Sequence, residues 1–177
     1  KGAYITPGLI DTHLHGIGGY GTEDCSPDSI LGMSEALADF GVTSFLPTVY
    51  TDTLDKMIAS TKAIVAAMGK EKGAIIEGVN LEGPFISPER IGAQAPEGLQ
   101  AVNLDVFNKL YEAGEGKIVA MTIAPELKHM RTLALEAQKR GIVLLAGHTN
   151  ATYENIMDGM QCGILHTTHF FNAMSRL

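Results

Sequence analysis

The sequence contains no tryptophan, only two cysteines, and few aromatic residues of any kind (6%). Cys25 and Cys162 are too few and too far apart to form the disulfide framework of a small secreted domain. We therefore expect a reducing, cytoplasmic compartment. The chain also lacks an apolar run close to the roughly 20 residues that a membrane-spanning helix requires, so no membrane association is expected.

Basic residues are scarce as well. The chain has 13 Lys and Arg against 20 Asp and Glu, a net charge of -7. Because contacts to nucleic-acid phosphates are made mainly by Lys and Arg, this balance argues against a nucleic-acid partner. A small anionic ligand stays compatible with it, since local groups can hold one anion. With 177 residues, 45% of them hydrophobic, the chain is long enough to bury the core of one globular domain.

Short apolar runs alternate with longer amphipathic ones, which is typical of parallel βα units. Six runs rich in Val, Ile, Leu, Thr or Phe predict strands. They are residues 5–15, 42–49, 74–81, 117–123, 142–146 and 164–170. Five segments with apolar residues at helical spacing predict helices between them. They are residues 29–40, 53–68, 104–113, 130–139 and 153–160.

The fold class follows from the composition of the strands. Strands that are apolar on both faces indicate a sheet covered on both sides, either a doubly wound open sheet or a (β/α)8 barrel. A barrel of about 250 residues uses about 31 residues per unit, so this chain corresponds to about six βα units. No linker or low-complexity segment divides it. We expect an α/β fold in one continuous domain.

Residues 7–16 (PGLIDTHLHG) end an apolar run with a His-x-His pair. Residues two apart in a strand point to the same face, so the imidazoles of His13 and His15 can converge on one ion. A pair of solvated or hydrogen-bonded histidines is the alternative. The location favours a metal, because active sites of parallel α/β folds lie at the carboxyl ends of the strands.

Residues of metal-binding type also stand at the ends of three later strands. Glu82 follows the third apolar run and precedes a Gly-Pro turn, where an unpaired charge would be costly. His148 follows the fifth run, and His169 lies in the sixth. Each alone could be a structural residue, with Glu82 in a salt bridge. Four strand ends that all offer His or Glu together predict a metal centre.

The pattern predicts a different environment for two other histidines. His166 precedes His169 by three residues, so in a regular strand it faces the opposite side and should pack against a helix. His129 lies in the polar segment before the fourth helix and should be solvated. Neither is expected to bind metal.

The motif at residues 7–15 resembles the opening of the amidohydrolase superfamily, which consists of metal-dependent hydrolases on (β/α)8 barrels. Three further motifs look like signatures of the N-acetylglucosamine-6-phosphate deacetylase family within it. They are residues 81–86 (LEGPFI), 147–152 (GHTNAT) and 168–174 (THFFNAM). The resemblance extends over essentially the whole chain. It implies hydrolysis of the amide of N-acetyl-D-glucosamine 6-phosphate to acetate and D-glucosamine 6-phosphate.

The resemblance also implies a ligand set. Glu82, His148 and His169 would hold the principal ion, while His13 and His15 would hold a second ion with Glu82 as a bridge. Such ligands suit Zn²⁺, Fe²⁺, Co²⁺ or Mn²⁺, as one ion or two. The family is commonly homodimeric, so a homodimer is expected too.

Four residues match substrate-contacting positions of the family. Asn172 and Ala173 correspond to positions that contact the sugar phosphate, partly through main-chain groups, and Ala93 and Gln94 to a second such pair. Neutral amide and peptide N–H groups can bind an anion without a strongly basic chain. Two positions depart from the family pattern, because Gln94 replaces a common His and Ile91 replaces a common Lys. The departure at Gln94 allows a different substrate preference.

The resemblance places part of the expected enzyme outside this sequence. The general acid/base Asp of the family, at the end of strand eight, and its phosphate-binding Arg both fall beyond Leu177. Residues 1–177 would form a partial catalytic barrel with strands one to six, without strands seven and eight and a flanking β-sandwich domain. Two alternatives stay open: another amidohydrolase, acting on a different N-acyl amino sugar or a cyclic amide, and an inactive fragment that binds metal or sugar phosphate.

Overall fold

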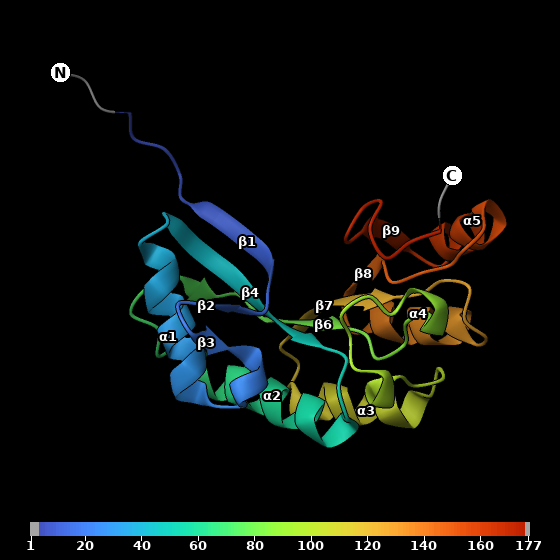
Figure 1. The fold of residues 1–177 in the computed structure, drawn as a ribbon, viewed down its shortest axis with the longest axis horizontal. Helices are drawn as coiled ribbons and strands as arrows, with labels where there is room; N and C mark the ends of the chain where they lie inside the picture. Colours follow the sequence, from blue (N-terminus) through green and yellow to red (C-terminus); the bar gives the residue numbers. More distant parts are fainter. Residues whose placement is uncertain (1–3, 176–177) are drawn as a thin grey trace.

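A computed structural model describes residues 4–175 of the chain (Figure 1). Its main strands are β1 (Leu9–Leu14), β4 (Val42–Tyr50), β5 (Ile75–Ile76), β6 (Val79–Glu82), β7 (Ile118–Ile123), β8 (Val143–Ala146) and β9 (Ile164–Thr167). The α-helices are α1 (Pro27–Ala38), α2 (Leu54–Ala67), α3 (Leu104–Ala113), α4 (Met130–Lys139) and α5 (Tyr153–Gln161). Two short strands, β2 (Gly16–Ile17) and β3 (Tyr20–Gly21), form an antiparallel hairpin after β1. Single turns of 3-10 helix are η1 (Thr22–Asp24), η2 (Pro88–Arg90) and η3 (Pro96–Gly98).

The strands of the main sheet are parallel, and their spatial order follows the chain: β1, β4, β6, β7, β8, β9. β5 pairs with the first part of β4, and β6 pairs with its last part, so these two short strands occupy one position in the sheet. The sheet therefore has six strand positions, each beside the one before it. This is the order of successive units in a (β/α) barrel, and it confirms the six predicted strands.

The sheet curls, and the helices cover its outer face (Figure 1). α1 and α2 pack against β4, α4 packs against β8, and α5 packs against β9. The core lies between these layers. Along β6, Leu81 is fully buried in that core, while its neighbours Asn80 and Glu82 point to the inner face, as the two-residue period of a strand requires.

The inner face is open between β1 and β9 in Figure 1. Each of the six strand positions contributes to a cavity on this face. The contributing side chains include Thr12, Leu46, Asn80, Ala120, Leu145 and His166. The curled parallel sheet with outer helices is the arrangement of a partial (β/α) barrel, as predicted. The predictions about strands seven and eight and a β-sandwich concern chain outside this sequence and stay predictions.

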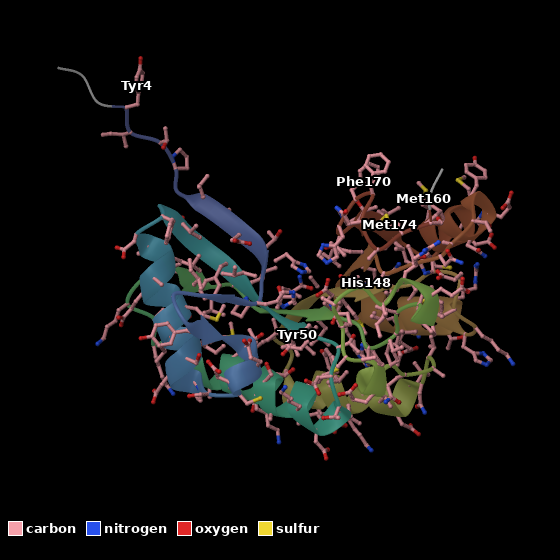
Figure 2. All side chains as sticks on the ribbon, in the orientation of Figure 1. Tyr4, Tyr50, His148, Met160, Phe170 and Met174 are labelled. Carbon is pink, nitrogen blue, oxygen red and sulfur yellow. The ribbon has the colours of Figure 1, made fainter. Side chains whose placement is uncertain are left out.

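Two strand boundaries differ from expectation by three residues or more. β1 begins at Leu9 because its partner β4 begins at Val42, and Tyr4 is 98% exposed and projects away from the molecule (Figure 2). β9 ends at Thr167, since His169 adopts a left-handed backbone (φ 54°) that cannot continue a strand. Among residues 4–175, no helix has the length and apolar character needed to cross a membrane.

Candidate metal centre

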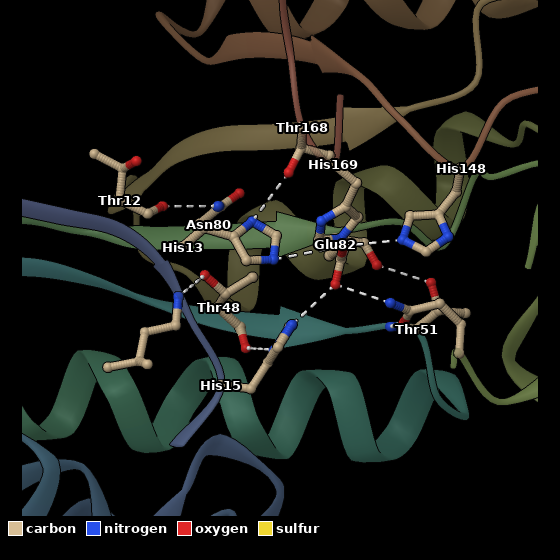
Figure 3. Close-up of polar contacts among 12 residues, drawn as sticks. Thr12, His13, His15, Thr48, Thr51, Asn80, Glu82, His148, Thr168 and His169 are labelled. Carbon is tan, nitrogen blue, oxygen red and sulfur yellow. Dashed lines mark hydrogen bonds and ion pairs between the residues drawn. The ribbon is translucent and has the colours of Figure 1, made fainter. Parts of the chain in front are cut away.

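The five predicted metal-binding side chains meet at the carboxyl edge of the sheet (Figure 3). Glu82 is the last residue of β6 and pairs in register with Tyr50 of β4 and Thr122 of β7. His13 and His15 come from the end of β1. His148 and His169 follow β8 and β9. Because parallel strands end at the same edge, residues far apart in sequence become neighbours here.

Glu82 lies at the centre of this cluster and is fully buried. Its backbone position is fixed by Thr51, whose hydroxyl donates to the Glu82 carbonyl at 2.8 Å. Gly83 makes this contact possible, because a Cβ there would lie 2.0 Å from Thr51 Oγ1, and its φ of 97° suits glycine. The glycine after Glu82 is therefore part of how the site is built.

His148 and His169 both adopt left-handed backbone conformations, with φ of 47° and 54°. Non-glycine residues seldom do so, and such conformations cluster at functional sites. Here they turn the chain away from the extended path of the strands and direct both imidazoles toward Glu82. Gly147 lets the two loops approach, since a Cβ on it would lie 2.3 Å from Thr168 Cγ2.

The two carboxylate oxygens of Glu82 face different histidines. Oε1 lies 3.0 Å from His148 Nε2, 3.4 Å from His13 Nε2, and in contact with His169 Nε2. Oε2 lies 3.0 Å from His15 Nε2. Two groups of potential metal ligands result, and they share Glu82. One is His13, His15 and Glu82, and the other is Glu82, His148 and His169.

Hydrogen bonds to backbone carbonyls set the tautomers of two histidines. His15 Nδ1 lies 2.9 Å from the Thr48 carbonyl, and His148 Nδ1 lies 3.0 Å from the Arg90 carbonyl. A carbonyl oxygen only accepts, so each Nδ1 must carry a proton. In the neutral ring, Nε2 then presents a lone pair to a Glu82 oxygen.

Two acceptors 3.0 Å apart repel each other unless the imidazole takes a second proton or a cation lies nearby. The buried Nε2 of His13 also has no hydrogen-bond partner among the described residues. Four imidazoles around one carboxylate are a donor set for divalent ions such as Zn²⁺. The residues therefore fit a divalent metal.

The charges of the cluster are strongly coupled. Burial opposes ionisation of Glu82, but the neighbouring imidazoles of His13, His148 and His15 outweigh it and hold the pKa of the carboxyl well below its usual range. Burial likewise opposes charge on His15 and His148, yet the hydrogen bond to Glu82 raises the pKa of both imidazoles. The carboxylate is thus kept ionised inside the protein, which favours binding of a cation.

The predicted substrate-contacting residues flank this cluster. A Cβ on Gly92 would lie 3.1 Å from His148 Cε1 and 3.7 Å from the Ala173 Cβ, so the segments at 91–94 and 172–173 are neighbours beside the cluster. Ala93 and Asn172 are exposed. Gln94 is buried, and its side-chain amide donates to Glu82 Oε2 at 2.8 Å.

The prediction for His166 is wrong. The imidazole lines the inner face of the sheet with Leu145 and Asn80 instead of packing against a helix. The register between β8 and β9 shifts here, since Leu144 pairs with Ile164 but Leu145 pairs with His166. The extra residue reverses the side to which His166 points. His129 is exposed, as predicted.

Sequence reasoning missed several residues that support the cluster. The Thr48 backbone carbonyl accepts a hydrogen bond from His15 Nδ1–H. Glu126, after β7, accepts hydrogen bonds from the Thr149 hydroxyl and from the Asn150 backbone N–H, the latter at 2.7 Å. Glu126 therefore anchors the loop that carries His148. A carboxylate three residues beyond the end of β7 was the available signal.

Comparison with known proteins agrees with this geometry. The sequence profile of the Amidohydrolase family matches residues 4–177. An N-acetylglucosamine-6-phosphate deacetylase from Bacillus subtilis is 35% identical over 97% of this chain and 44% of its own length. An N-acetylgalactosamine-6-phosphate deacetylase from Escherichia coli O157:H7 is 28% identical over 98% of the chain and 46% of its own length.

A solved structure of N-acetylglucosamine-6-phosphate deacetylase from Thermotoga maritima superimposes with a TM-score of 0.86. It is 33% identical, over 97% of this chain and 45% of the solved one. The chain thus spans less than half the length of these relatives. The family profile covers nearly every residue and includes all five residues of the cluster. The chain belongs to the amidohydrolase family.

Proposed function

We propose that Glu82, His148 and His169 hold one divalent ion and that His13 and His15, with Glu82 as a bridge, hold a second. The observation that carries the proposal is the pair of three-residue ligand groups sharing one buried carboxylate. Zn²⁺, Fe²⁺, Co²⁺ and Mn²⁺ all suit such ligands. When bound, a divalent ion supplies Lewis acidity that activates water and polarises an amide carbonyl.

The protein that carries this chain is proposed to hydrolyse N-acetyl-D-glucosamine 6-phosphate to D-glucosamine 6-phosphate and acetate. The names of the Bacillus and Thermotoga relatives support this substrate. Asn172 and Ala173 would contact the sugar phosphate, and Ala93 would lie beside the substrate. Ala93 and Asn172 are exposed and Ala173 is half-buried next to the ligand cluster, which leaves room for a small molecule.

Within this chain, the residues prepare the site rather than transfer the final proton. The Thr48 and Arg90 carbonyls keep protons on Nδ1 of His15 and His148, which directs each Nε2 toward the centre. Glu82 keeps its negative charge there. Departure of the amine requires a general acid, a role that the family resemblance assigns to an Asp outside residues 1–177.

The test uses the protein at its natural full length, loaded with Zn²⁺ or Co²⁺. Acetate release is measured with N-acetylglucosamine 6-phosphate, N-acetylgalactosamine 6-phosphate, unphosphorylated N-acetylglucosamine and a cyclic amide. The proposal expects the highest kcat/KM with N-acetylglucosamine 6-phosphate and loss of turnover on chelation. Turnover of only the cyclic amide, or of no compound, would refute it.

A second candidate is deacetylation of a different N-acyl amino sugar phosphate. The relative from Escherichia coli O157:H7, named for N-acetylgalactosamine 6-phosphate, favours it. A higher kcat/KM for the galactosamine compound in the same panel would select this candidate.

Two further expectations belong to the whole protein. We propose a homodimer and a cytoplasmic location, as the resemblance and the cysteine usage predicted. Light scattering of the purified full-length protein tests the first, since a monomeric mass would refute it. Microscopy of a tagged protein tests the second.

A further inference from the structure

Gln94 makes two buried hydrogen bonds beside the metal-ligand cluster. Its Nε2 donates to Glu82 Oε2 at 2.8 Å, and its Oε1 accepts from the Thr51 backbone N–H at 2.7 Å. The side chain is only 8% exposed. Both ends of the amide are thus engaged in hydrogen bonds inside the protein.

The orientation of this amide has one chemically consistent solution. The Thr51 backbone nitrogen only donates, so the atom that faces it must be the carbonyl oxygen of Gln94. The amide NH2 then faces Glu82, which is ionised and only accepts. Reversing the amide would create a donor facing a donor and an acceptor facing an acceptor.

The contact is specific to one side of the cluster. Gln94 donates to Oε2, the oxygen that also faces His15 at 3.0 Å. The other oxygen, Oε1, faces His13, His148 and His169. A hydrogen bond to a charged acceptor is stronger than one between neutral groups, and it also restricts the orientation of the acceptor. Gln94 therefore orients Oε2, the oxygen through which Glu82 faces His15.

We infer that Gln94 is a positioning residue of the metal centre, which orients Glu82 Oε2 toward the ion held with His13 and His15, rather than a contact to the substrate. The inference rests on the metal centre proposed above. Thr51 supports this arrangement with two hydrogen bonds. Its backbone N–H donates to the Gln94 side chain, and its hydroxyl donates to the Glu82 backbone carbonyl. Thr51, just after β4, thereby holds the Glu82 main chain directly and orients the Glu82 side chain through Gln94.

The direct test is a Co²⁺ titration of metal-free, full-length protein, followed by visible absorption of bound Co²⁺ and by calorimetry. Gln94→Met keeps the length of the side chain and removes the donor. Outer hydrogen-bond partners of metal ligands typically contribute about 10- to 100-fold in affinity. We expect Gln94→Met to weaken Co²⁺ binding by that factor and to alter the absorption spectrum. Gln161→Met, on an exposed position of α5, is the matched control.

A double-mutant cycle locates the effect. In a His15→Ala background, the loss caused by Gln94→Met should shrink to less than about 3-fold, because the ion that Oε2 serves is already weakened. Where Gln94→Met does not fold, judged by circular dichroism, Gln94→Ala is used, since a water molecule can enter the smaller side chain's space. Steady-state kinetics should show a lower kcat with KM changed less than about 3-fold.

Unchanged Co²⁺ affinity in the variant together with a large rise in KM would overturn the inference and restore Gln94 as a substrate contact. An equal loss of affinity in the wild-type and His15→Ala backgrounds would overturn it too. Wild-type protein that binds no Co²⁺ would refute the proposed metal centre itself. The two failures are therefore distinguishable.

Discussion

Replacing Glu82 with glutamine removes a buried negative charge and keeps the size of the side chain. Glu82 is the one residue that belongs to both ligand groups, and its side chain is completely buried. The variant therefore deprives each group of its single carboxylate. The neutral imidazoles that remain carry no charge to balance a divalent ion in a site shielded from water.

The size of the effect follows from the burial. Removing one partner of a buried charge pair costs about 3–5 kcal/mol, because the other charge is left uncompensated. At about 1.4 kcal/mol per tenfold change in affinity, this corresponds to a loss of about two to almost four powers of ten in metal affinity.

The assay is a calorimetric Zn²⁺ titration of metal-free, full-length protein, with metal content measured after gel filtration. Glu35→Gln on the exposed face of α1 makes the same change of charge far from the cluster and serves as the control. Circular dichroism verifies that both variants fold. Wild-type Zn²⁺ affinity in a folded Glu82→Gln protein would refute the reasoning that this carboxylate binds the metal.

Four other variants probe the fold and the surroundings of the cluster. Leu81→Ala should lower the free energy of unfolding by about 2–5 kcal/mol in urea denaturation, since the side chain is fully buried; a loss below about 1 kcal/mol would contradict its place in the core. Gly147→Ala should weaken Co²⁺ binding, because the new methyl group would lie 2.3 Å from Thr168 Cγ2 and push the two loops apart; wild-type affinity would show that the loops adjust freely. Glu126→Gln should weaken Co²⁺ binding about 10-fold by loosening the His148 loop, an idea that fails if the affinity is unchanged. His166→Ala should leave Co²⁺ affinity unaltered, because this side chain belongs to neither ligand group, and a marked loss would reveal a ligand that the geometry does not indicate.

Strands and helices were predictable because their signals are local. The apolar runs and the amphipathic segments correspond to the six strand positions and the five helices, and α3 and α4 have the predicted bounds. The location of Glu82 and His148 at strand ends could be predicted for the same reason, because a charged or polar residue that follows an apolar run differs from its neighbours.

Other features depend on pairing between distant segments. The inward direction of His166 results from a register shift against β8, which no periodicity along β9 reveals. The contact of Gln94 with Glu82 requires a loop to fold back across the carboxyl edge and meet Thr51. Glu126 acquires its role only because the loop after β8 lies beside the end of β7.

The sequence by itself determined the alternation of strands and helices and the chemical types at the strand ends, because hydrophobic period and residue chemistry act over a few neighbours. Only the tertiary structure decided which of those residues meet. Parallel pairing in chain order brings five side chains from four strands to one edge, and left-handed backbones at His148 and His169 turn two of them inward. Burial then gives the single carboxylate of Glu82 its central position, because a charge shielded from water must be balanced by the groups that the fold places around it.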